Sequence, residues 1–264
     1  MLNNISSFLP VGQFYLFNVV KNRLLFFLSL IVIFNNCSIT PDYLDLSSYY
    51  FPYQQLEEGL VYEYQSIEGD SLSTEYWFHK GVKDDNGWYH TGNYYDQDLR
   101  VRQFYREQIF ETGTVFKDYF LYLTDSTGKK ERIEAEIGVP NGFPFQLKDS
   151  TSILVTELSW IFSEVPKHKT SLIRNKQYAG KVNYRFKGTD KPAIQFSLKE
   201  LVDDETEGHL EAQYSGLEIY AKDIGLVYYY KEISDELRLQ YQLVDIYPMA
   251  KLEAKFKKQH EIQE

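Results

Sequence analysis

The sequence has almost no cysteine, because Cys37 is the single one among 264 residues. One thiol excludes an intrachain disulfide framework and a zinc ribbon. A domain of this length needs neither, since burial of about 70–75% of its unfolded surface supplies an ordinary core. The place of Cys37, directly after an apolar run, therefore needs a different explanation.

Positive charge is also scarce. The chain has 28 lysines and arginines against 38 aspartates and glutamates, and its first 36 residues hold Lys21 and Arg23 but no acidic residue. The remainder carries 26 basic and 38 acidic side chains, a net charge of −12. Polyphosphate and anionic lipid repel such a chain, so nucleic-acid binding is disfavoured and membrane attachment needs more than a basic patch.

Several catalytic signatures are missing. The sequence contains no G-x-S-x-G elbow, no H-E-x-x-H motif and no glycine-rich phosphate loop. The first would present a nucleophile, the second a zinc ion and the third a nucleotide. We therefore predict no catalytic residue, no metal site and no cofactor.

The longest strongly apolar stretch is short. Residues 24–34, LLFFLSLIVIF, would form a helix of roughly 16 Å, whereas a bilayer core needs about 20 apolar residues. The run has the length of a signal-peptide core, and Lys21 and Arg23 precede it as a signal peptide requires. We expect residues 1–36 to be a signal region, with the true translation start near Val20.

The end of this run, Phe34-Asn35-Asn36-Cys37-Ser38, resembles the lipobox of bacterial lipoproteins, with Asn36 in place of the usual small residue. The resemblance implies acyl chains (palmitate among them) on Cys37 and an anchor in the cell envelope. Ser38 is not the aspartate that retains many lipoproteins in the inner membrane, so the outer membrane is favoured. Two alternatives stay open: a secretory signal cut nearby, and an uncleaved anchor helix over 14–34.

The rest of the chain predicts an all-β protein. Aromatic and β-branched residues alternate with polar ones, and turn signals such as Asn86-Gly87 recur every 8–14 residues, which favours antiparallel pairing. We expect a large, curved antiparallel sheet, either a half-barrel or an open barrel. The predicted parts are a lipidated tether at 37–50, one β-rich domain at 51–248, and a helical or disordered tail at 249–264.

Two further stretches resemble β-rich bacterial envelope lipoproteins. One is Tyr50-Phe51-Pro52 followed by Glu58-Gly59-Leu60-Val61-Tyr62, and the other is Ala221 to Tyr228, AKDIGLVY. The resemblance implies a sheet curled like the half-barrels of lipoprotein-sorting proteins. It implies no catalytic residue.

Titratable residues give weak candidates for sites. His79 and His90 flank the Asn86-Gly87 turn, so they can meet across a hairpin, either as partly exposed sheet residues or as metal ligands. Glu134 and Glu136 share a strand face at a spacing of about 6.5–7 Å, within the range of about 5–9.5 Å that glycosidases use. Solvent-facing glutamates explain the pair better, because such pairs are routine on strand surfaces and no aromatic residue lies beside this one in sequence.

Two acidic runs and several aromatic runs complete the inventory. Asp96-Gln97-Asp98 and Asp203-Asp204-Glu205 either solvate turns or attract Ca²⁺. The stretches WYHTGNYY, YFLYL and VYYY either pack the core or line a binding groove. We expect a non-catalytic envelope module that binds an acyl chain, a peptide or a partner protein. The alternative is a glycan-active envelope enzyme that uses a carboxylate pair.

Overall fold

The computed structural model describes residues 43–67, 74–124, 128–162, 168–205, 208–234 and 237–263, with side chains up to Lys258. The chain divides into two compact units, Met1–Asp42 and Tyr43–Glu264, and the description concerns the second. The predicted signal region 1–36 and Cys37 lie outside the described residues. Within the described part, no helix is both long enough and apolar enough to cross a bilayer.

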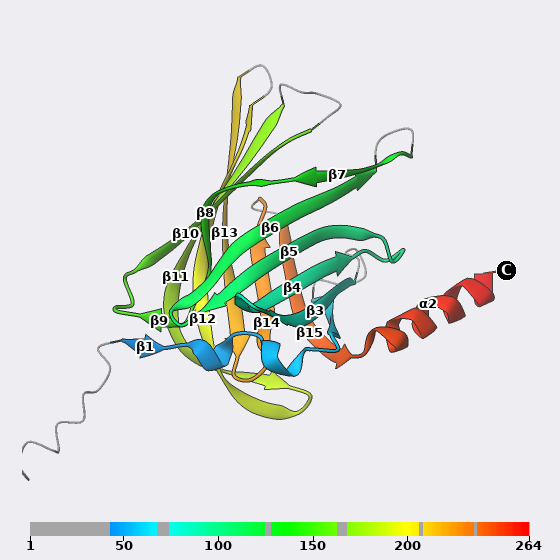
Figure 1. Cartoon of the computed structure of the whole chain (residues 1–264), viewed down its shortest axis with the longest axis horizontal. Helices are drawn as coiled ribbons and strands as arrows, with labels where there is room; N and C mark the ends of the chain where they lie inside the picture. The colour runs from blue at the N-terminus through cyan, green and yellow to red at the C-terminus, as the bar shows by residue number, and fades with distance from the viewer. Residues whose placement is uncertain are drawn as a thin grey trace, which may run out of the picture. The chain divides into compact units, whose positions relative to one another are not determined.

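Antiparallel strands make up most of the described chain (Figure 1). Two 3₁₀ helices, η1 (Ser47–Tyr49) and η2 (Tyr53–Gln55), lie near the start, and an α-helix, α2 (Met249–Gln263), lies at the end. The strands are β1 (Leu44–Asp45), β2 (Leu60–Ser66), β3 (Glu75–Asp84), β4 (Gly87–Tyr95), β5 (Val101–Phe110), β6 (Gly113–Thr124), β7 (Lys130–Glu134), β8 (Glu136–Pro144), β9 (Gln146–Leu147), β10 (Ile153–Ile161), β11 (Lys169–Phe186), β12 (Thr189–Glu205), β13 (His209–Ala221), β14 (Gly225–Glu232) and β15 (Arg238–Tyr247).

The large sheet closes on itself. Its strand order is β5-β4-β3-β2-β15-β14-β13-β12-β11-β10-β8-β6, and β6 pairs back with β5, so twelve strands form a barrel. Strand β6 is shared: it pairs with β5 over most of its length, with β8 near its start and with β7 near its end. The predicted all-β, curved antiparallel architecture is confirmed. The β5–β6 pairing goes further than a half-barrel, because closure satisfies both sheet edges.

Side-chain alternation decides which face of each strand lies inside. In β12, Ile194, Phe196, Leu198 and Glu200 are buried, while the residues between them are more exposed. A turn forms within Asp84–Gly87 as predicted, but Asp85 and Asn86 are its two central residues, and Gly87 already pairs with Asp84 at the start of β4. Gly87 has φ +118°, and the Asn86 amide donates to the Asp84 carboxylate at 2.7 Å. Local turn chemistry and strand period therefore agree with the closed fold.

The segment before β2 covers one end of the sheet. Residues Leu46, Tyr50, Phe51 and Leu56 are buried in the main core, and β1 pairs with β9. Glycines make room for this segment, since a Cβ on Gly81 would lie 1.8 Å from the Tyr53 carbonyl oxygen. We call residues 46–56 the plug. The predicted tether at 37–50 is therefore wrong from residue 44 onward, because apolar residues in this stretch are buried in the core.

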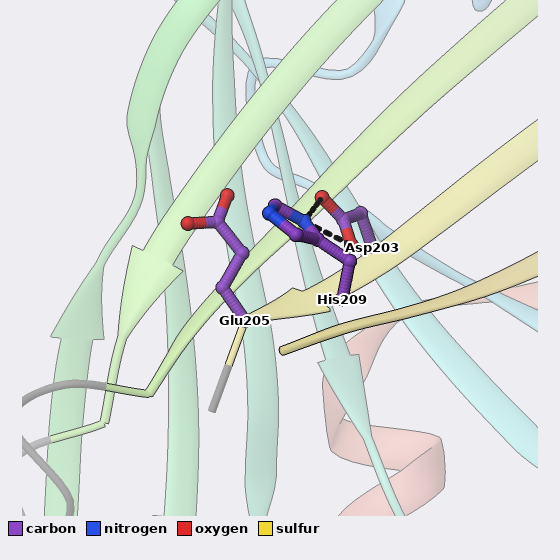
Figure 2. A group of neighbouring side chains, drawn as sticks. All are labelled: Asp203, Glu205 and His209. Atoms are coloured by element: carbon purple, nitrogen blue, oxygen red, sulfur yellow. Dashed lines mark hydrogen bonds and ion pairs between the residues drawn. The ribbon is translucent and has the colours of Figure 1, made fainter. Parts of the chain in front are cut away.

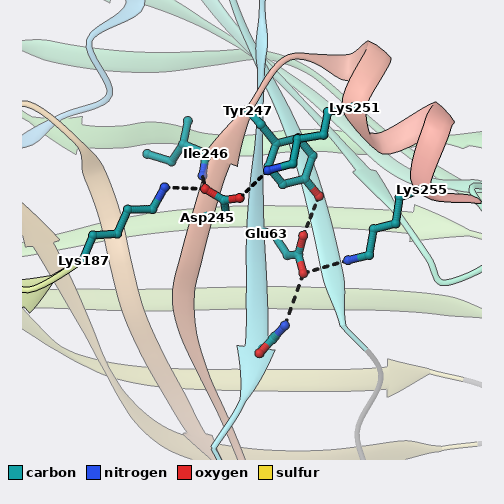
Figure 3. A network of polar contacts seen from close by, with 8 residues as sticks. Glu63, Lys187, Asp245, Ile246, Tyr247, Lys251 and Lys255 are labelled. Carbon is teal, nitrogen blue, oxygen red and sulfur yellow. Dashed lines mark hydrogen bonds and ion pairs between the residues drawn. The ribbon is translucent and has the colours of Figure 1, made fainter.

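The C-terminal tail is helical, and it is attached to the sheet. Leu252 and Phe256 of α2 are buried against a second cluster that contains Val61, Tyr76 and Tyr247. Figure 3 shows the polar contacts around this junction: Lys251 donates to Asp245 at 2.8 Å and Lys255 donates to Glu63 at 3.0 Å. Glu63 also accepts a hydrogen bond from the Tyr247 hydroxyl at 2.5 Å. The disordered alternative for the tail does not hold over Met249–Lys258.

Candidate functional site: a cavity inside the closed sheet

A cavity of about 350 Å³ lies between the plug and the inner face of the sheet. Aromatic side chains make most of its wall, and a few charged groups interrupt them. The aromatic lining comprises Tyr50, Phe51, Tyr64, Trp77, Tyr94, Tyr105, Phe116, Tyr119, Phe143, Tyr220 and Tyr229. The titratable lining outside the tyrosines comprises Glu75, His79, Glu107, Arg174 and Glu218. Predominantly apolar walls with a few polar groups are typical of small-molecule sites.

A chain of hydrogen bonds runs along the floor of the cavity. The Tyr50 hydroxyl from the plug donates to the Glu107 carboxylate and lies 2.7 Å from Nδ1 of His90. Nε2 of His90 lies 3.1 Å from Nδ1 of His79. Phe51 stacks over both imidazoles, with ring centroids 4.2 and 4.7 Å away. The plug therefore fixes both histidines by contact on one face and by hydrogen bonding along the chain.

All the hydrogen bonds of this chain are satisfied when Tyr50, His90 and His79 each donate one hydrogen bond. The Tyr50 hydroxyl donates its hydrogen bond to Glu107, so the same oxygen is free to accept a hydrogen bond from Nδ1–H of His90. Nε2 of His90 then accepts from Nδ1–H of His79, which leaves Nε2 of His79 as an acceptor. Burial, with a smaller contribution from His90, lowers the pKa of His79 well below its usual value, so this ring is neutral at pH 7. Burial likewise raises the pKa of Tyr50, and Glu107 reinforces the shift.

The predicted meeting of His79 and His90 across the hairpin is confirmed. The prediction that they are partly exposed is wrong, because their exposed fractions are 3% and 0%. The reason is topological: closure of the sheet turns their face inward, and the plug then covers it. Their nitrogens hydrogen-bond to one another and to Tyr50.

One wall of the closed sheet, formed by β11 to β14, holds paired charges, and two of these residues, Arg174 and Glu218, line the cavity. Arg174 and Lys231 both contact Glu200, each at 2.5 Å, and Lys176 contacts Glu218 at 2.7 Å. Burial alone would raise the pKa of Glu200, but the two cations outweigh it and lower the value to about 2. The pKa of Glu218 is likewise lowered, because Lys176 and Arg174 together outweigh its burial. Both acids are ionised near neutral pH.

The wall formed by β2 to β5 holds Glu75, which also lines the cavity but in a different setting. Its carboxylate accepts from the Tyr229 hydroxyl at 2.6 Å and from Nε1 of Trp77 at 3.0 Å, both at Oε2. No lysine, arginine or histidine of the described residues forms an ion pair with it. Burial raises the pKa of Glu75 above its usual value, and the two hydrogen bonds only partly oppose this.

Aromatic rings surround Glu75. Trp77 stacks on Tyr94, with centroids 5.2 Å apart and an interplanar angle of 20°, and contacts Tyr105 at 6.1 Å. Tyr229 contacts Tyr64 edge-on at 6.0 Å. Strands β2 to β5 and β14 thus bring one carboxylate and several π faces to the same side of the cavity.

The predicted glycosidase-like pair lies elsewhere. Glu134 at the end of β7 and Glu136 at the start of β8 are both exposed, whereas Ile133 and Ala135 between and beside them are buried. Neither glutamate lines the cavity. The prediction that both lie on the face of one strand is wrong, because the chain passes from β7 to β8 between them; both are nevertheless exposed.

The two acidic runs mostly organise turns. Asp96 accepts backbone hydrogen bonds from Asp98 and Arg100, each at 2.9 Å, and pairs with Arg102 at 2.6 Å. Burial opposes ionisation of Asp96, but these contacts outweigh it and lower its pKa. Solvation and capping of a turn therefore explain this run.

The second run includes a cluster that the sequence did not fully predict. Figure 2 shows Asp203 and Glu205 on β12 beside His209 on β13, with candidate ligand atoms within 4.8 Å of one another. His209 forms an ion pair with Asp203 at 3.0 Å, and hydrogen bonding to Asp203 raises its pKa. Asp204 instead contacts His168 at 2.6 Å. Because Asp203 and His209 already pair with each other, no metal ion is needed to explain their arrangement.

Sequence reasoning missed the charged groups of the cavity. The signal was present in β3, where Glu75, Trp77 and His79 alternate with Tyr76 and Phe78. Both faces of this strand are aromatic, so period alone did not show which face lies inside. The aromatic stretches were divided between core packing and a groove, and Tyr94, Tyr119 and Tyr229 from those stretches line the cavity.

Comparisons with known proteins give limited likenesses. No family model matches the chain, and no curated protein matches it. A proposed lipoprotein from Parabacteroides distasonis is similar in structure, with a TM-score of 0.48 and 9% identity over 76% of this chain and 98% of that one. A proposed exported protein with a YmcC-like fold from Bacteroides fragilis is similar with a TM-score of 0.49 and 12% identity, over 75% and 99% of the two chains.

Proposed function

We propose that the protein is a lipid-anchored component of the bacterial cell envelope that binds a small ligand inside its closed sheet and does not catalyse a reaction. The cavity of about 350 Å³ carries this proposal, because its volume falls within the range of small-ligand sites, about 300–1,000 Å³. Aromatic walls supply contact area, and Glu75, His79 and Arg174 supply polar groups that orient a ligand.

The side chains that line the cavity narrow the choice among the predicted ligands, which are an acyl chain, a peptide and a partner protein. An acyl chain gains nothing from Glu75 or Arg174, since burying charged groups against hydrocarbon is costly. A peptide or a partner protein needs an extended surface, whereas these side chains converge on a confined space. A compact, partly polar molecule fits the lining better than either. The glycan-enzyme alternative is not proposed, because Glu134 and Glu136 lie outside the cavity.

The cellular address is proposed from the sequence. The run at 24–34 ends near Cys37, and the lipobox resemblance places acyl chains on that residue. Two or more chains anchor a protein stably, and Ser38 favours the outer membrane. Mass spectrometry of the mature amino terminus tests this address. We expect a chain that begins at an acylated Cys37, whereas a terminus upstream of it would contradict the anchor.

Ligand binding is tested on the full-length protein extracted from membranes in mild detergent. Native mass spectrometry should reveal a copurifying small molecule, or a screen of small metabolites should yield a binder. A Leu158→Trp substitution fills the cavity and should abolish binding, because Leu158 lines it.

Ile153→Trp is the matched control, since Ile153 lies on the same strand, β10, and is 61% exposed. It should bind like the wild type. Circular dichroism confirms that both variants are folded. A wild-type protein that binds nothing, or a folded Leu158→Trp variant that binds normally, would contradict the proposed function.

A further inference from the structure

The interior has more carboxylates than cations that can pair with them. Arg174, Lys176 and Lys231 are all engaged by Glu200 and Glu218. Glu75 and Glu107 also lie inside, and neither has a lysine or arginine partner among the described residues. Glu107 receives the Tyr50 hydroxyl and has His90 at 3.8 Å. Among the described residues, Glu75 accepts hydrogen bonds from two neutral donors, Tyr229 and Trp77.

Glu75 is half-buried. A carboxylate that is withdrawn from water without a cation is costly, and a protein usually compensates for it. Glu75 has a neutral alternative, protonation, which the upward pKa shift reflects. It also has an external alternative, a positive ligand. Both hydrogen bonds end on Oε2, so Oε1 is left for a further partner. The cavity provides the space for that partner.

The rings around Glu75 favour the positive ligand. Cations bind over the faces of tryptophan and tyrosine, and tryptophan is the strongest of these partners. Trp77 and Tyr229 hydrogen-bond to Glu75. Each of Tyr94, Tyr105 and Tyr64 contacts one of those two rings, and all five residues line the cavity. A carboxylate combined with several π faces is the chemistry that recognises an organic ammonium group.

On the basis of the proposed binding function, we propose that the ligand carries a compact organic ammonium group, which sits against Trp77 and Tyr94 with Glu75 as its counterion. The remainder of the ligand extends toward Arg174 and Glu218, which also line the cavity. Choline, a quaternary ammonium alcohol, is a suitable probe. Its carbon isostere, in which a carbon atom replaces the nitrogen, is the neutral control of the same shape.

The test is calorimetric titration of the full-length, detergent-extracted protein with each compound. Choline should bind about tenfold or more tightly than the isostere, since a desolvated cation–π contact and an ion pair are both lost in the latter. Glu75→Gln keeps an acceptor for Tyr229 and Trp77 but removes the charge. It should weaken choline binding about tenfold and leave the isostere unaffected.

Matched controls and pH separate the possible outcomes. Glu134→Gln removes an exposed outer carboxylate and should change nothing. The affinity for choline should fall as the pH is lowered through the raised pKa of Glu75. Four tyrosines interact electrostatically with Glu75, their pKa values are raised, and they stay protonated over this range: Tyr64, Tyr94, Tyr229 and Tyr241.

Equal binding of choline and its isostere, or choline binding unchanged by Glu75→Gln, would overturn the ammonium proposal. Absence of binding by both compounds would overturn it as well. None of these three results contradicts the proposed function if Leu158→Trp abolishes the binding of the copurified molecule or of a binder from the screen. It fails separately if no molecule binds in that way.

Discussion

The two walls of the closed sheet hold carboxylates in opposite ways. On the β11–β14 wall, Glu200 and Glu218 have cationic partners and lowered pKa values. On the β2–β5 wall, Glu75 has a hydroxyl and an indole as its partners among the described residues, and its pKa is raised. Charge that is matched internally stabilises the fold and has no need of a ligand. A carboxylate without a cationic partner, by contrast, can pair with a positively charged ligand. The predictions below test this difference between the two walls.

Removal of Glu200 should give the largest effect. Glu200→Gln leaves Arg174 and Lys231 without their shared carboxylate. A broken buried pair costs about 3–5 kcal/mol, and partial solvent access of both cations should reduce the loss to about 2–3 kcal/mol. Urea denaturation followed by circular dichroism measures it.

Glu232→Gln is the control for that measurement. Glu232 also contacts a cation, Arg238, but both side chains are exposed. The expected change in the free energy of unfolding is within about 0.5 kcal/mol. Equal losses for the two variants would show that the paired wall contributes no more than a surface ion pair.

The floor of the unmatched wall should give the next largest effect. Tyr50→Phe removes the hydroxyl that donates to Glu107 and contacts His90. Two buried polar groups then lose their partner, at a cost of about 1–3 kcal/mol. Thermal or urea unfolding measures this loss. The control is Tyr43→Phe, which lies at an exposed position and should leave stability unchanged within about 0.5 kcal/mol.

The position of the plug can also be tested. Gly81→Ala would bring a Cβ to 1.8 Å from the Tyr53 carbonyl, whereas Gly208→Ala meets nothing within 4 Å. We expect Gly81→Ala to displace η2 and lower stability by about 1–3 kcal/mol, and Gly208→Ala to be neutral. Hydrogen exchange of the Leu56 and Tyr53 amides reports the displacement directly. Unchanged protection in Gly81→Ala would show that the sheet yields instead of the plug.

The sequence was a better guide to strands than to the site. Alternation in stretches such as GLVYEYQS and the turn at Asn86-Gly87 predicted antiparallel strands, because period and turn chemistry are local properties. Closure depends on the pairing of β5 with β6 and on the shared use of β6, which no local pattern specifies. Pro41 and the small polar residues near it favour a tether in the sequence, so the burial of the following segment is not predicted. Burial of Leu46 and Tyr50 depends on a surface formed by strands far away in sequence.

The candidate site was missed for the same reason. Glu75 lies 154 positions before Tyr229, and the hydrogen bond between them exists only because β2, β3, β14 and β15 are neighbours in the sheet. By contrast, Glu134 and Glu136 attracted notice because they are close in sequence. Proximity along the chain identified an exposed pair, and the carboxylates that line the cavity came from separate strands.

The smallest expected effect is on the pH dependence of stability, and it has opposite signs for the carboxylates of the two walls. The folded state raises the pKa of Glu75, so it binds the Glu75 proton more tightly than the unfolded state does. This contributes stability below the unfolded pKa of about 4.5, and the contribution is lost as the pH rises through the folded value. Glu200 has the opposite linkage: its contribution is present above the unfolded pKa and is lost as the pH falls toward about 2.

Glu75→Gln should therefore match the wild type in acid and become the more stable of the two as the pH rises, while Glu218→Gln should be the less stable at neutral pH. Comparison of each variant with the wild type at the same pH cancels the contributions of other groups, including His79. Urea denaturation from about pH 4 to about pH 8, that is, from just below to well above the usual glutamate pKa of about 4.5, gives the curves. If Glu75→Gln instead loses stability steadily as the pH rises, the Glu75 carboxylate is already matched by a cation in the folded protein, and the unmatched wall would not be the place where a positive ligand is recognised.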